Sequence, residues 1–192
     1  SIGSHAFCNC TSLTSVTIPE SVTSIGDSAF RNCYKLVEII NHSSLNIICG
    51  SEDYGYIGYY AKEVNMGESK IVNVGDYLFY TYNGVNYLLG YIGTDTELVL
   101  PENYNGENYE IYKYAFYNCS SLVSVVIPKT VTSIGISAFA NCTKLANIWF
   151  EGTQEQWNAI TKGKNWNLGC KATIQIMVAA DGHTHDKTKL DA

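Results

Sequence analysis

Apolar residues recur along the chain at fixed distances from an Ala-Phe pair. Phe7 and Phe30 are 23 residues apart, and so are Phe116 and Phe139. One such unit cannot bury its own apolar face, so we expect the copies to stack on one another. Four copies align, beginning at Ile2, Ile25, Ile111 and Ile134: IGSHAFCNCTSLTSVTIP, IGDSAFRNCYKLVEI, IYKYAFYNCSSLVSVVIP and IGISAFANCTKLANIWF.

The two halves of each copy have different periodicities. In the first copy Val16 and Ile18 alternate with polar residues and Pro19 follows, which predicts a short strand that the proline ends. In the second copy Ala29 and Phe30 lie three or four residues before Cys33, a spacing that predicts about two turns of helix or 3₁₀ helix. We therefore expect each copy to form a strand, a turn and a short helix. Successive strands would pair in parallel about 4.8 Å apart, with Phe over Phe.

These copies resemble the leucine-rich repeats of the BspA-like family of treponemal and oral bacterial surface proteins. The matching pattern is Ile-Gly-x-x-Ala-Phe-x-x-Cys-x-x-Leu-x-x-Val-x-Ile-Pro, and it covers residues 1–45 and 97–150. The third copy departs from it, because Tyr112 stands where the others have Gly, and a bulky residue is unexpected at a tight bend. The resemblance implies an α/β leucine-rich-repeat solenoid with parallel strands on the concave face and short helices or 3₁₀ turns opposite. It also implies a non-enzymatic, adhesive role in a secreted or cell-surface bacterial protein.

The segment 46–96 lies outside the repeat pattern and holds many of the tyrosines, which also continue into the third copy. Asp53 is a predicted helix N-cap, with Ile57, Tyr60, Ala61 and Val64 on one face of that helix. Asn83-Gly84 between two alternating runs predicts a hairpin that pairs Tyr82 with Val85 and Tyr80 with Tyr87, leaving Phe79 and Leu88 on the opposite face. We expect an island integrated into one solenoid domain rather than a second domain.

The segment 151–180 has the features of a terminal cap. Thr153 and Gln156 form a capping-box pattern, which predicts a helix with Trp157 and Ile160 on its inner face. Trp166 and a strand in KATIQIMV follow. Because the open end of a solenoid exposes its core, we expect this cap to cover it, followed by a flexible tail at 181–192. Family members often have a cysteine before a final Asp-Gly; here Ala179-Ala180 precede Asp181, so any role of that cysteine does not transfer.

Composition narrows the function classes. With 46% hydrophobic residues the chain should fold, and a net charge of −6 gives no basic footprint for nucleic acid or an anionic membrane. No apolar run is long enough to span a bilayer and no leader is visible, although the chain starts inside a repeat and resembles part of a longer protein. Seven cysteines cannot all pair within one chain.

Recurrent polar residues have structural explanations. Cys10, Cys33, Cys119 and Cys142 share one repeat position and should form a buried column of unpaired thiols, while Cys8 should face outward and is the better candidate for reactivity. The asparagines Asn9, Asn32, Asn118 and Asn141 also share a position, where their amides would satisfy backbone groups of the turn.

Catalytic and metal-binding patterns are weak. His183, His185, Asp181 and Asp186 could bind a divalent metal, but a terminal tail is the simpler explanation, so we predict no metal and no cofactor. His5 and His42 are isolated, and no acidic pair suited to glycoside hydrolysis is evident. An enzyme acting on glycans would need paired carboxylates from a set comprising Glu52, Asp53, Asp76, Glu107 and Glu110.

The concave sheet is the predicted binding surface, because solenoids use this face for extended recognition. Residues beside the buried Val or Ile of each strand should face solvent there: Ser15, Thr17, Glu38, Ile40, Ser124, Val126, Asn147 and Trp149. Trp149 suits a binding anchor but could equally pack under the terminal helix. We expect an extracellular protein or glycan as partner, with the tyrosine-rich island as a second contact. The alternative is a structural spacer in a larger surface protein. The sequence leaves the oligomeric state open.

Overall fold

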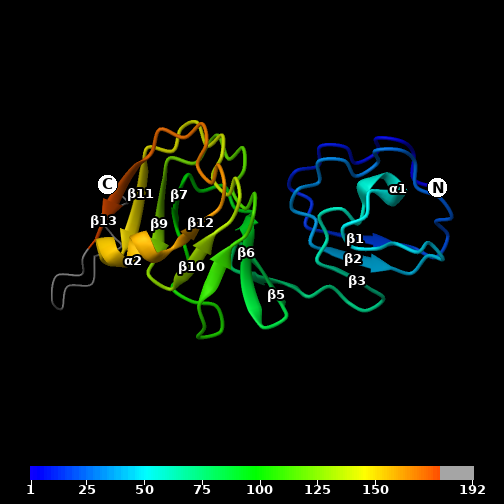
Figure 1. Cartoon of the computed structure of the whole chain (residues 1–192), viewed down its shortest axis with the longest axis horizontal. Helices are drawn as coiled ribbons and strands as arrows, with labels where there is room; N and C mark the ends of the chain where they lie inside the picture. The colour runs from blue at the N-terminus through cyan, green and yellow to red at the C-terminus, as the bar shows by residue number, and fades with distance from the viewer. Residues whose placement is uncertain (178–192) are drawn as a thin grey trace.

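Strands recur once or twice per repeat in the computed structural model, which describes residues 1–177 (Figure 1). The first sheet has the order β1-β2-β3 and consists of β1 (Ser15–Ile18), β2 (Glu38–Asn41) and β3 (Glu63–Asn65). The second has the order β12-β10-β8-β6-β5-β4 and consists of β4 (Ile71–Val74), β5 (Tyr77–Tyr82), β6 (Val85–Tyr91), β8 (Tyr109–Ile111), β10 (Val131–Ile134) and β12 (Thr161–Lys162). The third has the order β13-β11-β9-β7 and consists of β7 (Glu97–Val99), β9 (Ser124–Pro128), β11 (Asn147–Glu151) and β13 (Thr173–Ile176).

The stacked coils form two blocks. The N-terminal block, residues 1–65, contains the first sheet, and the C-terminal block, residues 71–177, contains the other two; the linker is residues 66–70 (Figure 1). Each block has its own apolar core. Phe7 stacks on Phe30 with ring centroids 5.0 Å apart, and Phe116 stacks on Phe139 at 4.9 Å. The predicted stacking of Phe on Phe is therefore confirmed in both blocks.

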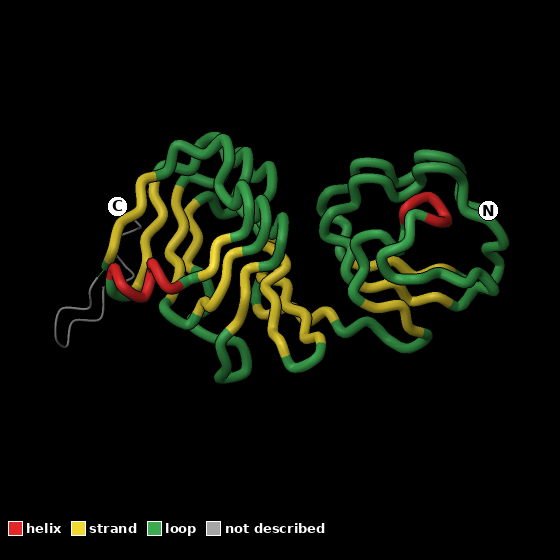
Figure 2. The backbone as a smooth tube through the Cα atoms, in the orientation of Figure 1, coloured by secondary structure: helices red, strands yellow, loops and turns green. Residues whose placement is uncertain are grey.

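The Ala-Phe half of each copy is not helical, and that prediction is wrong. These segments are successive turns, drawn as loops in Figure 2. Left-handed backbone conformations occur twice in each copy and prevent a continuous helix. The residues concerned are His5, Asn9, Ser28, Asn32, Tyr114, Asn118, Ser137 and Asn141. Backbone hydrogen bonds instead join one coil to the next, as from Phe7 N to Ala29 O at 2.8 Å and from Phe116 N to Ala138 O at 2.7 Å. The fold is a leucine-rich-repeat β-solenoid with few helices.

The segments just before Tyr112, Gly135 and Gly163 in the C-terminal block add strands that the pattern did not predict. β8, β10 and β12 pair in parallel within the second sheet. Side chains from this sheet, such as Ile111 and Ile134, share one core with Val125 and Ile148 of the third sheet. Each coil of this block therefore places one strand on each side of the core.

The predicted helix after Asp53 is also wrong. The helix α1 (Asp53–Tyr56) has only four residues, two of them left-handed, and no side chain caps it. The chain instead forms a third coil, in which β3 pairs in parallel with β2 and sets Val64 beside Ile39. Ile57 is buried in the core as expected, but at a turn rather than on a helix.

The predicted hairpin at Asn83-Gly84 is confirmed. Both turn residues have positive φ, and Tyr82 pairs with Val85 and Tyr80 with Tyr87. Its two faces pack in different places. Phe79 and Leu88 enter the core of the C-terminal block, whereas Tyr80 and Leu89 belong to a small cluster with Val37 of the N-terminal block. A third antiparallel strand, β4, was not expected.

Residues 151–177 follow the expected order of helix and strand. The helix α2 (Gln154–Ala159) begins at a capping box formed by Thr153 and Gln156. Trp157 and Ile160 are buried, and Trp157 meets Trp166 edge-on with ring centroids 6.0 Å apart. β12 and β13 then add the last strand to the second and third sheets. The histidines of the predicted tail lie outside the described residues.

The bend at Tyr112 is the same as in the other copies. Tyr112 N donates to Leu88 O at 2.9 Å, just as Gly26 N donates to Ile2 O and Gly135 N to Ile111 O. A Cβ on either of these glycines would collide with the backbone of the preceding coil. Tyr112 belongs to the first Ala-Phe coil of its block, as Gly3 does in the other block, and a Cβ on Gly3 would meet nothing within 4 Å. A side chain at this glycine position is therefore excluded only where another Ala-Phe coil precedes it in the stack.

Gly135→Ala should destabilise the protein by about 1–3 kcal/mol, because the added methyl group would push two coils apart. Gly3→Ala, the matched control at the first coil, should leave stability within about 0.5 kcal/mol of wild type. Urea denaturation followed by circular dichroism measures both. Equal effects of the two substitutions would contradict the explanation by coil contact.

Candidate functional site

The eight side chains predicted to bind a partner lie in two separate sheets. On the first sheet Ser15 pairs with Glu38 and Thr17 with Ile40. On the third sheet Ser124 pairs with Asn147 and Val126 with Trp149. These two groups are in different blocks, so they do not form one continuous surface (Figure 1).

Solvent exposure was predicted wrongly for half of this set. Glu38, Ile40, Ser124 and Val126 are buried, with 0–8% of their surface exposed. They lie on β2 and β9, each of which has a strand on both sides, and neighbouring side chains cover them. Thr17 is exposed, whereas Ser15, Asn147 and Trp149 are half-buried.

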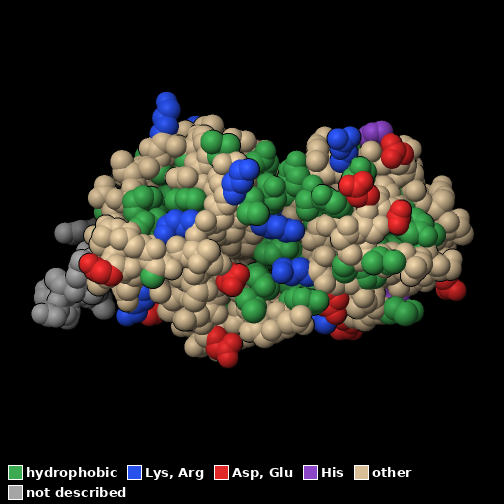
Figure 3. Space-filling model, in the orientation of Figure 1, with side chains coloured by type: hydrophobic (Ala, Val, Ile, Leu, Met, Phe, Trp, Pro, Cys, Tyr) green, Lys and Arg blue, Asp and Glu red, His purple; other side chains and the backbone are tan. Residues whose placement is uncertain are grey.

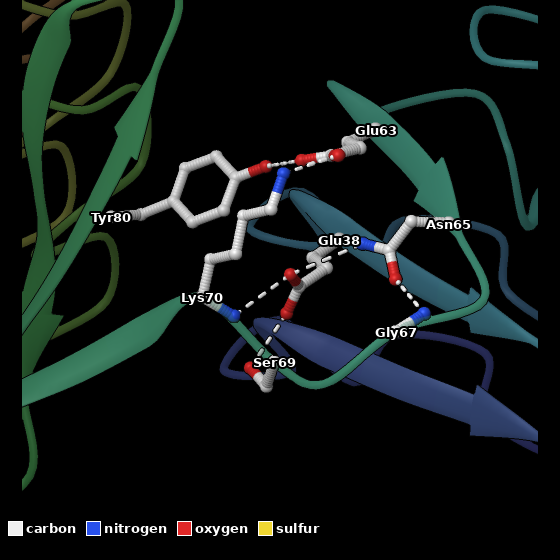
Figure 4. A network of polar contacts seen from close by, with 7 residues as sticks. All are labelled: Glu38, Glu63, Asn65, Gly67, Ser69, Lys70 and Tyr80. Carbon is white, nitrogen blue, oxygen red and sulfur yellow. Dashed lines mark hydrogen bonds and ion pairs between the residues drawn. The ribbon is translucent and has the colours of Figure 1, made fainter.

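Glu38 binds the linker rather than a partner (Figure 4). Its carboxylate accepts hydrogen bonds from Ser69 Oγ at 2.6 Å, from Lys70 N at 2.9 Å and from Asn65 Nδ2 at 3.5 Å. Donors from three residues therefore satisfy a carboxylate that is 0% exposed. No sequence pattern indicated this role, because the donors come from an unpatterned segment about thirty residues away.

Glu63 continues this network towards the C-terminal block (Figure 4). It pairs with Lys70 Nζ at 2.5 Å and accepts a hydrogen bond from the buried Tyr80 hydroxyl at 2.9 Å. The hydrogen bond from Lys70, followed by that from Tyr80, holds the pKa of Glu63 below its usual value. Because the folded-state pKa is the lower one, this contribution to stability is present above the unfolded-state pKa and is lost as the pH falls through the folded-state value.

Glu38→Ala should lower the free energy of unfolding by about 2 kcal/mol, because it removes a charged acceptor from three donors. Glu20→Ala, at an exposed acid of the same block, should change it by less than about 0.5 kcal/mol. Chemical denaturation measures both values. A Glu38→Ala variant as stable as the control would show that the network contributes nothing.

Tyrosines from distant parts of the chain gather where the two blocks meet. Tyr34 stacks on Tyr114 with ring centroids 4.5 Å apart, and it meets Tyr60 and Tyr117 edge-on at 5.3 and 5.8 Å. Tyr59 meets Tyr60 edge-on at 4.8 Å and is 42% exposed. Burial, followed by the neighbouring Tyr34, raises the pKa of Tyr60 to about 12, so the phenol stays neutral at physiological pH.

Two lysines lie among these rings. Lys62 Nζ is 4.5 Å from the ring centroid of Tyr87 and 5.6 Å from that of Tyr112, and Lys113 Nζ is 5.5 Å from the centroid of Tyr112. We call the half-exposed part of this group the junction surface; it comprises Tyr34, Tyr59, Tyr60, Lys62, Tyr87, Lys113, Tyr114 and Tyr117. Figure 3 shows hydrophobic and basic side chains together in the hollow between the blocks.

Beneath the junction surface the two blocks are packed together. Val37, the residue just before β2, lies in an apolar cluster with Tyr80, Leu89 and Tyr112. The buried Lys35 donates from Nζ to Ala115 O, and burial lowers the pKa of its ammonium group. The island tyrosines stand out in the sequence, but their contact with Tyr34 does not, because contacts across about 80 residues leave no periodic signal.

The acids that an enzyme would require do not form a buried pair. Glu52 and Asp53 lie at α1, and Asp76 lies in the turn between β4 and β5; all three are exposed. Glu107 and the half-buried Glu110 line a shallow, open depression of about 560 Å³ beside the Asn105-Gly106 turn. Within residues 1–177 no group of three or more His, Cys, Asp or Glu side chains could hold a metal ion.

The asparagine column is real, but its hydrogen bonds differ from the prediction. Asn32 Nδ2 donates to Asn9 Oδ1 at 2.9 Å, and Asn141 Nδ2 donates to Asn118 Oδ1 at 3.0 Å. All four residues have φ of 60–63°, a conformation in which asparagine is favoured among non-glycine residues. The amides therefore join coil to coil instead of satisfying the turn backbone.

The cysteine column is buried only where a coil precedes it. Cys33 and Cys142 are 0% exposed, and their thiols donate to Phe7 O at 3.1 Å and Phe116 O at 3.0 Å. Cys10, in the first coil, is exposed, so its predicted burial is wrong, and it is more accessible than the half-buried Cys8. Cys170 extends the column in a coil without an Ala-Phe pair, which the alignment missed.

Thiol labelling should separate these cysteines. Burial raises the pKa of Cys33 and of Cys142 to about 12, so neither should react with iodoacetamide at pH 8 in the folded protein, whereas the exposed Cys10 should react within minutes. Peptide mass spectrometry before and after denaturation in urea identifies the modified sites. Native-state labelling of Cys142 at the rate of Cys10 would contradict this order.

Comparison with known proteins places the repeats in a family. The model of the BspA type leucine rich repeat region matches six copies, over residues 1–88 and 104–161. No curated protein matches the chain. A leucine-rich repeat protein from Bacteroides capillosus is similar, at 22% identity over 57% of this chain and 100% of its own, with a TM-score of 0.40. A leucine rich cell surface protein from Faecalibacterium prausnitzii is similar at 20% identity over 83% of this chain and 65% of its own, with a TM-score of 0.37.

In the described part of the chain no helix has the length and apolarity needed to cross a membrane. The family match covers well over half of the sequence, and it rests on the residues that stack the coils. This chain belongs to the BspA-type leucine-rich repeat family.

Proposed function

We propose that the chain is a non-enzymatic binding module of a secreted or cell-surface bacterial protein, and that it recognises an extracellular protein or glycan mainly through the junction surface. The observation that supports this most is the gathering of tyrosines and two lysines from both blocks, and Figure 3 shows hydrophobic and basic side chains where the blocks meet. Tyrosine rings offer rigid contact area with a polar hydroxyl, which suits recognition surfaces.

The concave sheet, which the sequence predicted as the binding surface, is a weaker candidate for partner binding than the junction surface. Of the eight residues predicted there, only Thr17 is fully exposed, with Ser15, Asn147 and Trp149 half-buried. Trp149 remains the best anchor in this group, because it is an aromatic residue beside the exposed Gln175 of β13. We propose that this patch is at most a secondary contact.

A structural spacer is the alternative function. The contacts that support it are those that hold the blocks together, such as the Tyr34–Tyr114 stack and the Lys35–Ala115 hydrogen bond. In that case we infer that the chain forms one continuous solenoid, with residues 151–177 covering its end. An enzyme is disfavoured, since Glu52, Asp53 and Asp76 are exposed and apart from Glu107 and Glu110.

An array of extracellular-matrix proteins and glycans tests the proposal. Tyr59→Ala combined with Tyr117→Ala should weaken binding to whichever ligands the wild-type chain retains by about tenfold, the typical loss for truncated aromatic anchors. Thr17→Ala combined with Trp149→Ala should weaken it by less than about threefold. Binding lost only in the variant with Thr17→Ala and Trp149→Ala would place the site on the strands instead. A wild-type chain that binds no ligand on the array would favour the structural spacer.

A further inference from the structure

Two ammonium groups of the junction surface share one aromatic ring. Lys62 Nζ is 5.6 Å from the centroid of Tyr112 and Lys113 Nζ is 5.5 Å from it. Lys62 comes from the N-terminal block and Lys113 from the C-terminal block. The stacking of the two blocks therefore brings these like charges together around a ring that is 5% exposed.

Neither ammonium group has a carboxylate partner. Among residues 1–177 the only ion pair is that of Lys70 with Glu63. Lys62 Nζ donates to the Tyr87 hydroxyl at 3.4 Å and Lys113 Nζ donates to Tyr60 O at 3.5 Å, both long for hydrogen bonds. Because each ammonium group has three donors, most of their donor capacity is left over. Burial, followed by the charge on Lys62, lowers the pKa of Lys113, so the pairing carries a cost that a bound anion would remove.

The ring between them carries an unsatisfied hydroxyl. Tyr112 Oη is the only buried side-chain nitrogen or oxygen in the described part of the chain without a hydrogen-bond partner. Buried hydroxyl groups normally have a partner, since burial without one costs free energy. Tyr112 is also the residue that replaces the repeat glycine. A side chain fits at this position because Tyr112 belongs to the first Ala-Phe coil of its block. The departure from the repeat pattern thus supplies the ring that both ammonium groups contact, while its hydroxyl is buried out of reach of a ligand.

The surrounding surface favours a sugar over an apolar peptide anchor. The apolar side chains beneath it, Val37, Tyr80 and Leu89, are all 0% exposed, so no apolar pocket opens there. The residues that keep exposed surface there are the tyrosines and the two lysines of the junction surface. Aromatic faces suit the C–H faces of pyranose rings, the hydroxyls suit sugar hydroxyls, and ammonium groups suit a carboxylate.

We propose that Lys62 and Lys113 form a binding site for the carboxylate of an acidic glycan, such as a uronic acid residue, with the neighbouring tyrosines of the junction surface contacting the adjoining sugar. This inference rests on the proposed function and specifies the ligand class of the junction surface. The competing explanation is that the lysines only hold the two blocks together through cation–π contacts.

Titration calorimetry with the purified chain tests the site, using a galacturonic acid tetramer and its neutral methyl ester as probes. The wild-type chain should bind the acid at least about tenfold more tightly than the ester, and this preference should fall as salt is raised. Lys62→Met and Lys113→Met should each remove most of the preference, whereas Lys144→Met, at an exposed lysine of the C-terminal block, should retain it.

Tyr112→Phe provides a matched control, because it keeps the ring that both ammonium groups contact. It removes only a hydroxyl that has no partner in the protein, so the melting temperature should stay the same or rise. Affinity for the acid should also stay within about twofold of wild type in this variant, because the buried hydroxyl cannot reach a ligand.

The outcomes separate this inference from the proposed function. Equal binding of acid and ester, or an unchanged preference for the acid in both lysine variants, would overturn the acidic-glycan site while binding through the junction surface could still stand. A wild-type chain that binds neither probe but binds a protein on the array would also overturn the site and keep the proposed function. A chain that binds neither probe and nothing on the array would overturn both.

Discussion

Direct contact between the backbones of successive coils is the constraint on which the rest of the structure depends. In the turn half of each repeat, backbone hydrogen bonds run from coil to coil rather than along the chain, as from Phe116 N to Ala138 O. A spacing of about 4.8 Å leaves no room for a Cβ at Gly26 or Gly135 and sets each phenylalanine on the next. The left-handed asparagines and the cysteine thiols that donate to the preceding coil belong to the same stack.

The same constraint explains where variation is tolerated. A first coil has no similar coil beneath it, so Cys10 is exposed and Tyr112 can occupy a glycine position. The C-terminal block begins with a hairpin instead of a repeat, and the hairpin has two apolar faces that pack on different cores. Strand β6 of the hairpin pairs in parallel with β8 and so continues the second sheet. One of its apolar faces packs against Val37 of the N-terminal block. Non-repeated residues therefore gather where the blocks meet.

Acidic and basic side chains where the two blocks meet differ in their hydrogen-bond partners. Glu38 and Glu63 have donors from the linker, from Lys70 and from Tyr80, so their carboxylates are satisfied within the protein. Lys62 and Lys113 have aromatic neighbours and long hydrogen bonds instead. This asymmetry, in a chain with a net charge of −6, is what directs attention to an anionic ligand.

The amino-acid pattern predicts the repeat, one strand in each copy, the stacked phenylalanines and the Asn83-Gly84 hairpin, because each depends on residues within about 25 positions of one another. It also led to a wrong helix in the turn half, since i+3 and i+4 spacing is shared by helices and by consecutive tight turns with left-handed residues. The burial of Glu38 and the contact of Tyr34 with Tyr114 are visible only in the three-dimensional fold, because both depend on how one block packs against its neighbour or linker. Such contacts join segments far apart in the chain, and no local pattern encodes them.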